Sequence, residues 1–181
     1  MSGGEELGPP IRTERIHDGV IVNLRSSDYR RPDGTVVTRE VMDHPGAVVM
    51  VPVEGDHVLL VRQPREAVER FTLELPAGKL DHPGEEPLEC AKRELAEEVG
   101  REAAVWRDVG GFFTAPAILT EFIHCFIATD LSPVDGVSAD EDEMIEVVTW
   151  PLDDLGTLID RVEDAKTLIG LLRLERELRA R

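Results

Sequence analysis

The chain has 181 residues and an apolar content typical of globular proteins, which is enough for one domain with a sizeable core. A formal net charge of −17 argues against nucleic acid or an anionic membrane as a partner, because both reward clusters of Lys and Arg. No apolar run reaches the length of a membrane span, and the first residues lack the basic and apolar regions of a signal peptide.

The cysteine content favours a cytoplasmic location. Cys90 and Cys125 are the only cysteines of the chain. Two cysteines in a composition otherwise typical of cytosolic proteins are more often free thiols than partners in a disulfide. We therefore expect free thiols, with a disulfide between the two as the alternative.

The first 43 residues predict a β-rich segment ahead of the main domain, which we place at residues 44–181. The first ten residues are rich in Gly, Pro and Glu and are expected to form a loose arm. The other elements expected here are strands at residues 20–25 and around Tyr29, a turn at residues 31–34, and a β-branched strand at residues 35–41. The last two strands would form a hairpin.

Two near-continuous apolar runs predict buried strands at the centre of the main domain. They span residues 47–53 and 57–62 and are joined by the turn sequence Glu54-Gly55-Asp56. The elements expected after residue 101 are strands at 103–109, 121–128 and 144–150, a helical region that begins at Pro151, and an amphipathic helix at 165–179.

Residues 74–101 predict a turn, a loop and then a helix. Pro76 and Gly78 interrupt whatever structure precedes them, and the Asp81-His82-Pro83-Gly84 run is typical of a loop. Pro87 is tolerated in a first helical turn, where its missing N–H has no partner within the helix. Gly100 stands where a helix commonly ends.

Three acids share one narrow face of this helix. Leu88, Ala91, Leu95 and Val99 fall together on a helical wheel and predict the face that packs on the core. Glu94, Glu97 and Glu98 fall on a neighbouring face at i, i+3 and i+4, where like charges repel one another. A solvated Glu-rich face is the ordinary interpretation, but a hard divalent cation with oxygen ligands would explain the cluster better.

The whole string around these acids resembles a known motif. Arg93-Glu94-Leu95-Ala96-Glu97-Glu98-Val99-Gly100 follows Glu85 at the spacing of the Nudix box, in which a glycine stands further upstream. Two positions depart from that pattern. Six residues rather than five separate Gly78 from Glu85, and Arg101 stands where the motif has an apolar residue. Neither departure touches the acids.

Flanking stretches are similar to the ADP-ribose pyrophosphatase subgroup of that family. Residues 61–65 read Val-Arg-Gln-Pro-Arg, and residues 74–78 read Glu-Leu-Pro-Ala-Gly. Arginine binds phosphate through two parallel hydrogen bonds, so substrate binding is expected for Arg65 above all, and also for Arg62. The resemblance adds Glu74 to the substrate-binding residues. Solvated strand ends are the alternative for both arginines.

The subgroup also has a Ser-Pro-Gly-like turn followed by an acid. This chain has Ala115-Pro116-Ala117 ahead of Glu121, so the acid is present and the glycine is missing. The resemblance adds Glu121 to the substrate-binding residues, with a loop of altered shape.

The resemblance implies an α+β Nudix fold, with a mixed sheet between helices and a small N-terminal sheet that pairs two subunits as a homodimer. It implies that Mg²⁺, or Mn²⁺, is held by Glu94, Glu97, Glu98 and the carbonyl of Ala77, with Glu97 and Glu98 also in the catalytic set. Arg93 would orient the acids. The acidic run at residues 139–143 would supply the general base from Glu141 or Glu143.

The function that the resemblance implies is hydrolysis of the pyrophosphate bond of a nucleoside diphosphate sugar, ADP-ribose first, giving AMP and ribose 5-phosphate. The alternatives are another nucleotide sugar such as GDP-mannose, or a non-catalytic module that binds a nucleotide as a signal. Intact acids at positions 94, 97 and 98 favour the enzyme, because a pure binder does not need a repulsive cluster.

Overall fold

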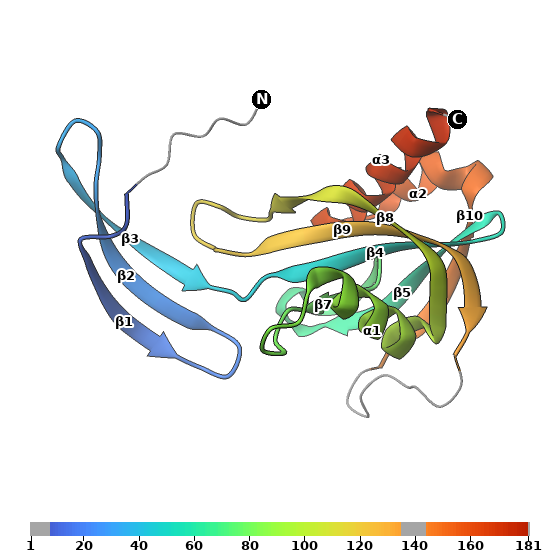
Figure 1. Cartoon of the computed structure of the whole chain (residues 1–181), viewed down its shortest axis with the longest axis horizontal. Coiled ribbons are helices and arrows are strands. Elements are labelled where there is room, and N and C mark those ends of the chain that lie inside the picture. The colour runs from blue at the N-terminus through green and yellow to red at the C-terminus, as the bar shows by residue number, and fades with distance from the viewer. Residues whose placement is uncertain (1–7, 135–143, 181) are drawn as a thin grey trace. The chain divides into compact units, whose positions relative to one another are not determined.

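The computed structural model describes residues 8–134 and 144–180, and the chain divides into two compact units (Figure 1). The first unit runs to Pro45 and also includes Phe113–Glu121. The second unit comprises Gly46–Phe112 and Phe122–Arg181.

The first unit is a three-stranded antiparallel sheet. Strands β1 (Arg12–Asp18), β2 (Asn23–Arg30) and β3 (Val36–Asp43) pair in the order β1-β2-β3. The predicted turn between β2 and β3 is confirmed, and Asp33 closes it by accepting hydrogen bonds from the Thr35 amide at 2.9 Å and the Thr35 hydroxyl at 2.7 Å. The predicted hairpin is therefore present. Strand β1 was not predicted, because its sequence is mostly charged and polar.

Polar contacts rather than an apolar core hold this small sheet together. Ser27 is the one buried residue in the described part of the unit. Arg25 donates from Nε to Asp43 at 2.8 Å and from Nη1 to Ser27 at 2.8 Å and to Tyr29 at 3.0 Å. Apolar side chains that a larger sheet would bury are exposed in the single chain, namely Ile11, Ile16, Val20, Ile21, Val22 and Val36.

The second unit is built on a mixed seven-stranded sheet. Its strands are β4 (Ala47–Glu54), β5 (His57–Arg65), β6 (Arg70–Glu74), β7 (Ala77–Lys79), β8 (Arg101–Phe113), β9 (Phe122–Pro133) and β10 (Glu146–Pro151). The main order is β10-β5-β4-β9-β8, with β6 paired to β5 and β7 paired to β4. Strands β4 and β9 run parallel at the centre, where strands are buried on both faces.

Helices cover both faces of this sheet, as the α+β prediction requires. Helix α1 (Pro87–Val99) packs on Val48 and Met50, whereas α2 (Leu155–Arg161) and α3 (Ala165–Arg179) pack on Val49 and Val51. Alternate residues of β4 point to opposite faces, so one strand serves both cores. Short 3₁₀ turns at Glu66–Val68 and Leu152–Asp154 complete the unit. The predicted α+β fold is confirmed.

The residue that departs from the motif after Gly100 has a structural role. Gly100 ends α1 with φ of 66°, a left-handed conformation that glycine adopts without strain. Arg101 donates from Nη1 to the Gly100 carbonyl at 3.2 Å and from Nε to Glu54 at 2.8 Å. The arginine thus ties the end of α1 to the turn between β4 and β5.

Both cysteines are free, as predicted, and both are buried. Burial raises the pKa of the Cys90 thiol to about 12 and that of Cys125 to about 11, so both stay protonated at neutral pH. In the part of the chain that the structure describes, no helix combines the length and apolarity needed to cross a membrane.

Two helical glycines give a matched test of the packing. A Cβ at Gly170 in α3 would lie 2.4 Å from Leu75 Cδ1 in the core, whereas a Cβ at Gly156 in α2 would meet nothing within 4 Å. We expect Gly170→Ala to lower the free energy of unfolding by about 1–3 kcal/mol through overpacking. Gly156→Ala should raise it by up to about 1 kcal/mol through helix propensity. Urea unfolding of both variants measures the contrast, and equal effects would contradict the close contact of α3 with Leu75.

Candidate functional site

Arg93 lies at the centre of the acidic face of α1. Its Nε and Nη2 donate to the two oxygens of Glu85 at 3.0 and 3.1 Å, and its Nη1 donates to Glu94 at 2.7 Å and to Glu97 at 2.9 Å. Hydrogen bonding by Arg93 holds the pKa of Glu85 below its ordinary value. One guanidinium therefore sets the positions of three carboxylates.

The backbone of residues 77–78 lies directly against the other side of this acid cluster. The Ala77 amide donates to Glu98 Oε2 at 3.0 Å, and Glu98 is only 8% exposed. A Cβ at Gly78 would lie 2.0 Å from Glu94 Cδ, so only glycine allows the Glu94 carboxylate to pack there. The Ala-Gly pair and the acids of α1 thus form one site.

Every residue from Glu74 to Gly78 has a specific contact with another segment of the second unit. The Leu75 amide donates to Thr167 Oγ1 at 2.8 Å, and the Pro76 carbonyl accepts from the Met50 amide at 2.9 Å. Together with the Ala77 and Gly78 contacts to α1, these bonds hold the segment between α1 and the start of α3. A segment held at successive residues positions its carbonyl groups firmly.

The Glu74 side chain anchors the beginning of this segment. It is 2% exposed and accepts two hydrogen bonds from Arg65, both at 2.8 Å, one from Thr72 at 2.6 Å and one from Lys166. Burial alone would raise the pKa of Glu74, but the bonds from Arg65 and Lys166 outweigh it and lower the pKa to about 2. Glu74 is thus an ionised carboxylate engaged by three protein side chains.

The two arginines of the Val-Arg-Gln-Pro-Arg stretch lie on opposite faces of β5. Arg65 lies on the α1 face together with Val61. Its pKa is raised mainly by the hydrogen bonds to Glu74 and further by the charge of Glu98. Arg62 shares the other face with Leu60, contacts Glu146 at 3.2 Å and lies 4.2 Å from the centre of the Phe71 ring. The strand alternation therefore brings Arg65, and not Arg62, to the side of the acid cluster.

The remaining predicted residues belong to the first unit or lie outside the described residues. Glu121 belongs to the first unit, where it accepts from Thr114 Oγ1 at 2.7 Å and faces His44 Nε2 at 3.4 Å. Glu141 and Glu143 lie within residues 135–143, outside the described residues. Their predicted roles stay predictions.

The donors on α1 match a hard divalent cation in kind, because all of them are carboxylate oxygens. Arg93 binds the carboxylates of Glu85, Glu94 and Glu97, and Glu98 accepts from the Ala77 amide. These four carboxylates thus have one guanidinium among them, so the group keeps a clear negative excess. Across residues 8–134 and 144–180, three or more His, Cys, Asp or Glu side chains do not converge as a finished metal site. Arg93 Nη1 donates to both Glu94 and Glu97, so these two carboxylates share the guanidinium as a partner.

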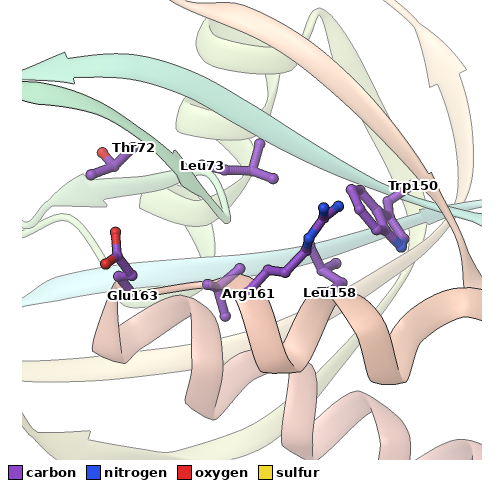
Figure 2. A pocket seen from close by; sticks show the side chains of 7 residues that line it. Thr72, Leu73, Trp150, Leu158, Arg161 and Glu163 are labelled. Carbon is purple, nitrogen blue, oxygen red and sulfur yellow. The ribbon is translucent and has the colours of Figure 1, made fainter.

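A pocket of about 140 Å³ lies elsewhere in the second unit. Figure 2 shows its lining side chains, which are Thr72, Leu73, Trp150, Leu158, Arg161, Val162 and Glu163. None of the described site residues lines it. Arg161 lies 5.9 Å from the centre of the Trp150 ring, and Thr72 connects the pocket to Glu74 by its hydrogen bond.

Comparison with known proteins agrees with this geometry. The family profile described as a NUDIX domain matches residues 42–171, more than half of the chain. The chain belongs to the Nudix family. The ADP-ribose pyrophosphatase of Bacillus subtilis (strain 168) is 38% identical to this Nudix chain, over 94% of the chain and 95% of the relative.

Two further matches cover nearly all of the Nudix chain. The methanol dehydrogenase activator of Bacillus methanolicus is 36% identical over 91% of both sequences. The crystal structure of an ADP compounds hydrolase aligns with a TM-score of 0.84 and 27% identity, over 98% of both chains. The predicted Nudix fold and the prediction of a Nudix pyrophosphohydrolase are confirmed.

Two polar residues of the second unit that bond to residues 74–75 were not predicted from the sequence. Lys166 and Thr167 begin α3, and each bonds to residues 74–75 across 92 positions of sequence. No local motif marks them. Asp164, two residues before Lys166, is a residue type that commonly caps a helix, so the start of the helix was visible in the sequence.

Glu74 predicts a specific acid dependence of stability. A carboxylate whose pKa is about 2 when folded and near the ordinary 4.5 when unfolded stabilises the fold above pH 4.5, and this contribution is lost as the pH falls toward 2. The loss should reach roughly 2 kcal/mol by about pH 3. Glu74→Gln should be less stable at neutral pH, and its difference from the parent should shrink by that amount on acidification. Urea unfolding at several pH values measures it, and a constant difference would contradict the assignment.

Proposed function

We propose that this Nudix hydrolase cleaves the pyrophosphate bond of a nucleoside diphosphate sugar with the help of a divalent metal ion, and that ADP-ribose is its preferred substrate. The observation that carries the proposal is the acid face of α1 packed against the backbone of Ala77 and Gly78. The similarity to an ADP-ribose pyrophosphatase over almost the full chain supports the choice of substrate. The products would be AMP and ribose 5-phosphate.

Glu94, Glu97 and Glu98 would hold Mg²⁺, or Mn²⁺, together with the carbonyl of Ala77. When bound, such an ion neutralises phosphate charge and lowers the pKa of a coordinated water. Arg93 keeps Glu94 and Glu97 oriented by its hydrogen bonds to them, and Arg65 binds a phosphate oxygen through its guanidinium. Glu141 or Glu143 would accept the proton of the attacking water. Arg62 and Glu121 stay proposals as substrate-binding residues.

Two alternatives follow from different observations. The relative named methanol dehydrogenase activator allows a regulatory role in which the chain acts through another enzyme. The acid cluster argues against a purely regulatory module, because three carboxylates gathered around Arg93 serve no purpose in binding an anionic nucleotide. GDP-mannose is the alternative substrate for the same chemistry.

Substitution of Glu98 by Gln tests the site most sharply. Gln keeps the volume and an acceptor oxygen for the Ala77 amide, so the hydrogen bond at 3.0 Å can persist while one charge is lost. We expect Glu98→Gln to lower kcat on ADP-ribose by roughly a hundredfold or more and to raise the Mg²⁺ concentration needed for half-maximal activity. The free energy of unfolding without metal should change by no more than about 1 kcal/mol.

Glu89→Gln provides the matched control for this variant. Glu89 lies on the same helix, is mostly exposed and forms an ion pair with Lys92 at 2.7 Å. Release of phosphate monoester from ADP-ribose, GDP-mannose and other nucleoside diphosphate derivatives measures the activities. A Glu98→Gln protein with the parent rate and the parent Mg²⁺ titration would contradict the site assignment. A parent that is inactive on every compound would favour the regulatory role.

We also propose that the chain is a cytoplasmic homodimer and that the sheet β1-β2-β3 pairs the subunits. The tip between β1 and β2 exposes Val20 at 103% and Ile21 at 72%, although both are β-branched apolar residues. Sheets with exposed apolar side chains and free edges usually find a partner. A second copy of this chain is the simplest one.

Light scattering should give a particle of twice the mass of one chain at micromolar concentration. Ile21→Asp should shift the particle toward the monomer, because a charge would then be buried in the interface. Val105→Asp, at an exposed apolar position of the second unit, should leave the mass unchanged. A monomeric parent at these concentrations would refute the dimer.

A further inference from the structure

The start of α3 carries a lysine that neither the motif nor the metal chemistry uses. The Lys166 side chain is only 14% exposed, and its Nζ donates to Glu74 Oε2 and lies 3.1 Å from Asp164 Oδ2. Asp164 is itself fixed as the helix cap, because its Oδ2 accepts from the Thr167 amide at 2.9 Å and the Thr167 hydroxyl at 2.6 Å. Lys166 is therefore held rigidly against Glu74.

We propose that Lys166 is a positioning residue for substrate binding, which acts by fixing the Glu74 carboxylate and, through it, the guanidinium of Arg65. This inference rests on the proposed function, in which Arg65 binds a phosphate oxygen of the substrate. This role is assigned to Lys166 from its contacts alone, since Lys166 is 92 positions away from Glu74 in the sequence.

The geometry of the Glu74 carboxylate explains how the effect is transmitted. Oε1 accepts from Arg65 Nε and from Thr72, and Oε2 accepts from Arg65 Nη2 and from Lys166. The terminal torsion of a glutamate is broad, so the plane of its carboxylate is set by its donors. An arginine that binds a carboxylate through two parallel bonds lies in that same plane. Donors on both oxygens therefore determine the orientation of Arg65.

Arg65 can be held by Glu74 and still bind a ligand. Its side chain is 44% exposed although its Nε and Nη2 are engaged by Glu74. Neither bond uses Nη1, so this nitrogen can turn toward a ligand. It lies on the α1 face of β5, where the charge of Glu98 also acts on it. The arginine thus joins the acid cluster to the network at the start of α3.

The charges of the network also favour an anionic substrate. Arg65 and Lys166 balance Glu74 and Asp164, so these four groups are neutral together. Removal of Lys166 leaves an uncompensated carboxylate beside the arginine and close to the acids of α1. Such a charge repels phosphate and weakens the field that attracts it. Both the lost orientation and the added charge act on substrate binding.

Lys166→Met tests the proposal by steady-state kinetics on ADP-ribose with saturating Mg²⁺. A phosphate is charged in the bound substrate and in the transition state, so Arg65 contributes similarly to both. We expect KM to rise roughly tenfold while kcat changes by no more than about twofold. Lys166→Arg, which restores a cation and a donor, should return KM to within about threefold of the parent. Arg179→Met removes an exposed cation from the same helix and should change neither constant.

Two results would overturn the proposal. One is a Lys166→Met protein with the KM of the parent, and the other is a fall in kcat at constant KM. If Lys166→Met does not fold, the double variant Glu74→Gln/Lys166→Met is tested in its place, because it removes both buried charges. The double variant should show the same rise in KM, and a parental KM in it would likewise overturn the proposal.

A second measurement separates this inference from the proposed function. The Arg65 Nε–H signal in the NMR spectrum, assigned by its loss in Arg65→Lys, reports the bond to Glu74 without any substrate. We expect this signal to shift and to exchange faster with solvent in Lys166→Met. A parent that does not cleave ADP-ribose would refute the proposed function only. An unchanged Arg65 signal in Lys166→Met would refute the positioning role even if the parent is active.

Discussion

The site depends on one short stretch of backbone, Glu74 to Gly78, that is bonded on both sides. Glu98 and Glu94 of α1 contact Ala77 and Gly78, and Thr167 of α3 accepts from the Leu75 amide. A buried backbone group without a partner is costly, so each of these bonds is needed for the fold as well as for the site. Residues on the two helices that cover opposite faces of the sheet thus meet at one strand end.

Charges near this stretch are stable only as a complete set. A buried carboxylate such as Glu74 loses its hydration, and only the bonds from Arg65, Thr72 and Lys166 offset that loss. Arg93 has the corresponding role on α1, where it holds Glu85, Glu94 and Glu97. Removing one partner from either group leaves a buried charge uncompensated. The two networks therefore couple the stability of the unit to the geometry of its acids.

Elements with a local cause could be predicted from the sequence. The helix at residues 165–179 and the end of α1 at Gly100 were predicted correctly, because a helical repeat and a glycine cap are visible in the chain itself. Strand β7 was missed because Pro76 and Gly78 indicate a turn, and only pairing with β4 makes the segment a strand. Strand β6 was also missed, and it pairs with β5. Strand β1 was missed because its charged sequence shows no alternation.

Site residues that depend on contacts between distant segments could not be predicted from the sequence. The acids of α1 share a face by spacing alone, so they could be grouped from the sequence. Strand alternation could also have separated Arg62 from Arg65, although the motif names both. The partners of Glu74 could not be predicted, because Lys166 reaches it only after the sheet and α3 have formed. Glu141 and Glu143 lie outside the described residues, and their roles rest on the resemblance.

The most direct test of a metal-dependent site on α1 is anomalous diffraction from crystals soaked in Mn²⁺ with a non-hydrolysable ADP-ribose analogue. We expect an anomalous peak bound by Glu94, Glu97 and Glu98, with the Ala77 carbonyl among its ligands. The Arg93 guanidinium should then have moved from between Glu94 and Glu97. An ordered analogue without a peak against α1, or with manganese bound only elsewhere, would contradict the assignment of these acids to metal.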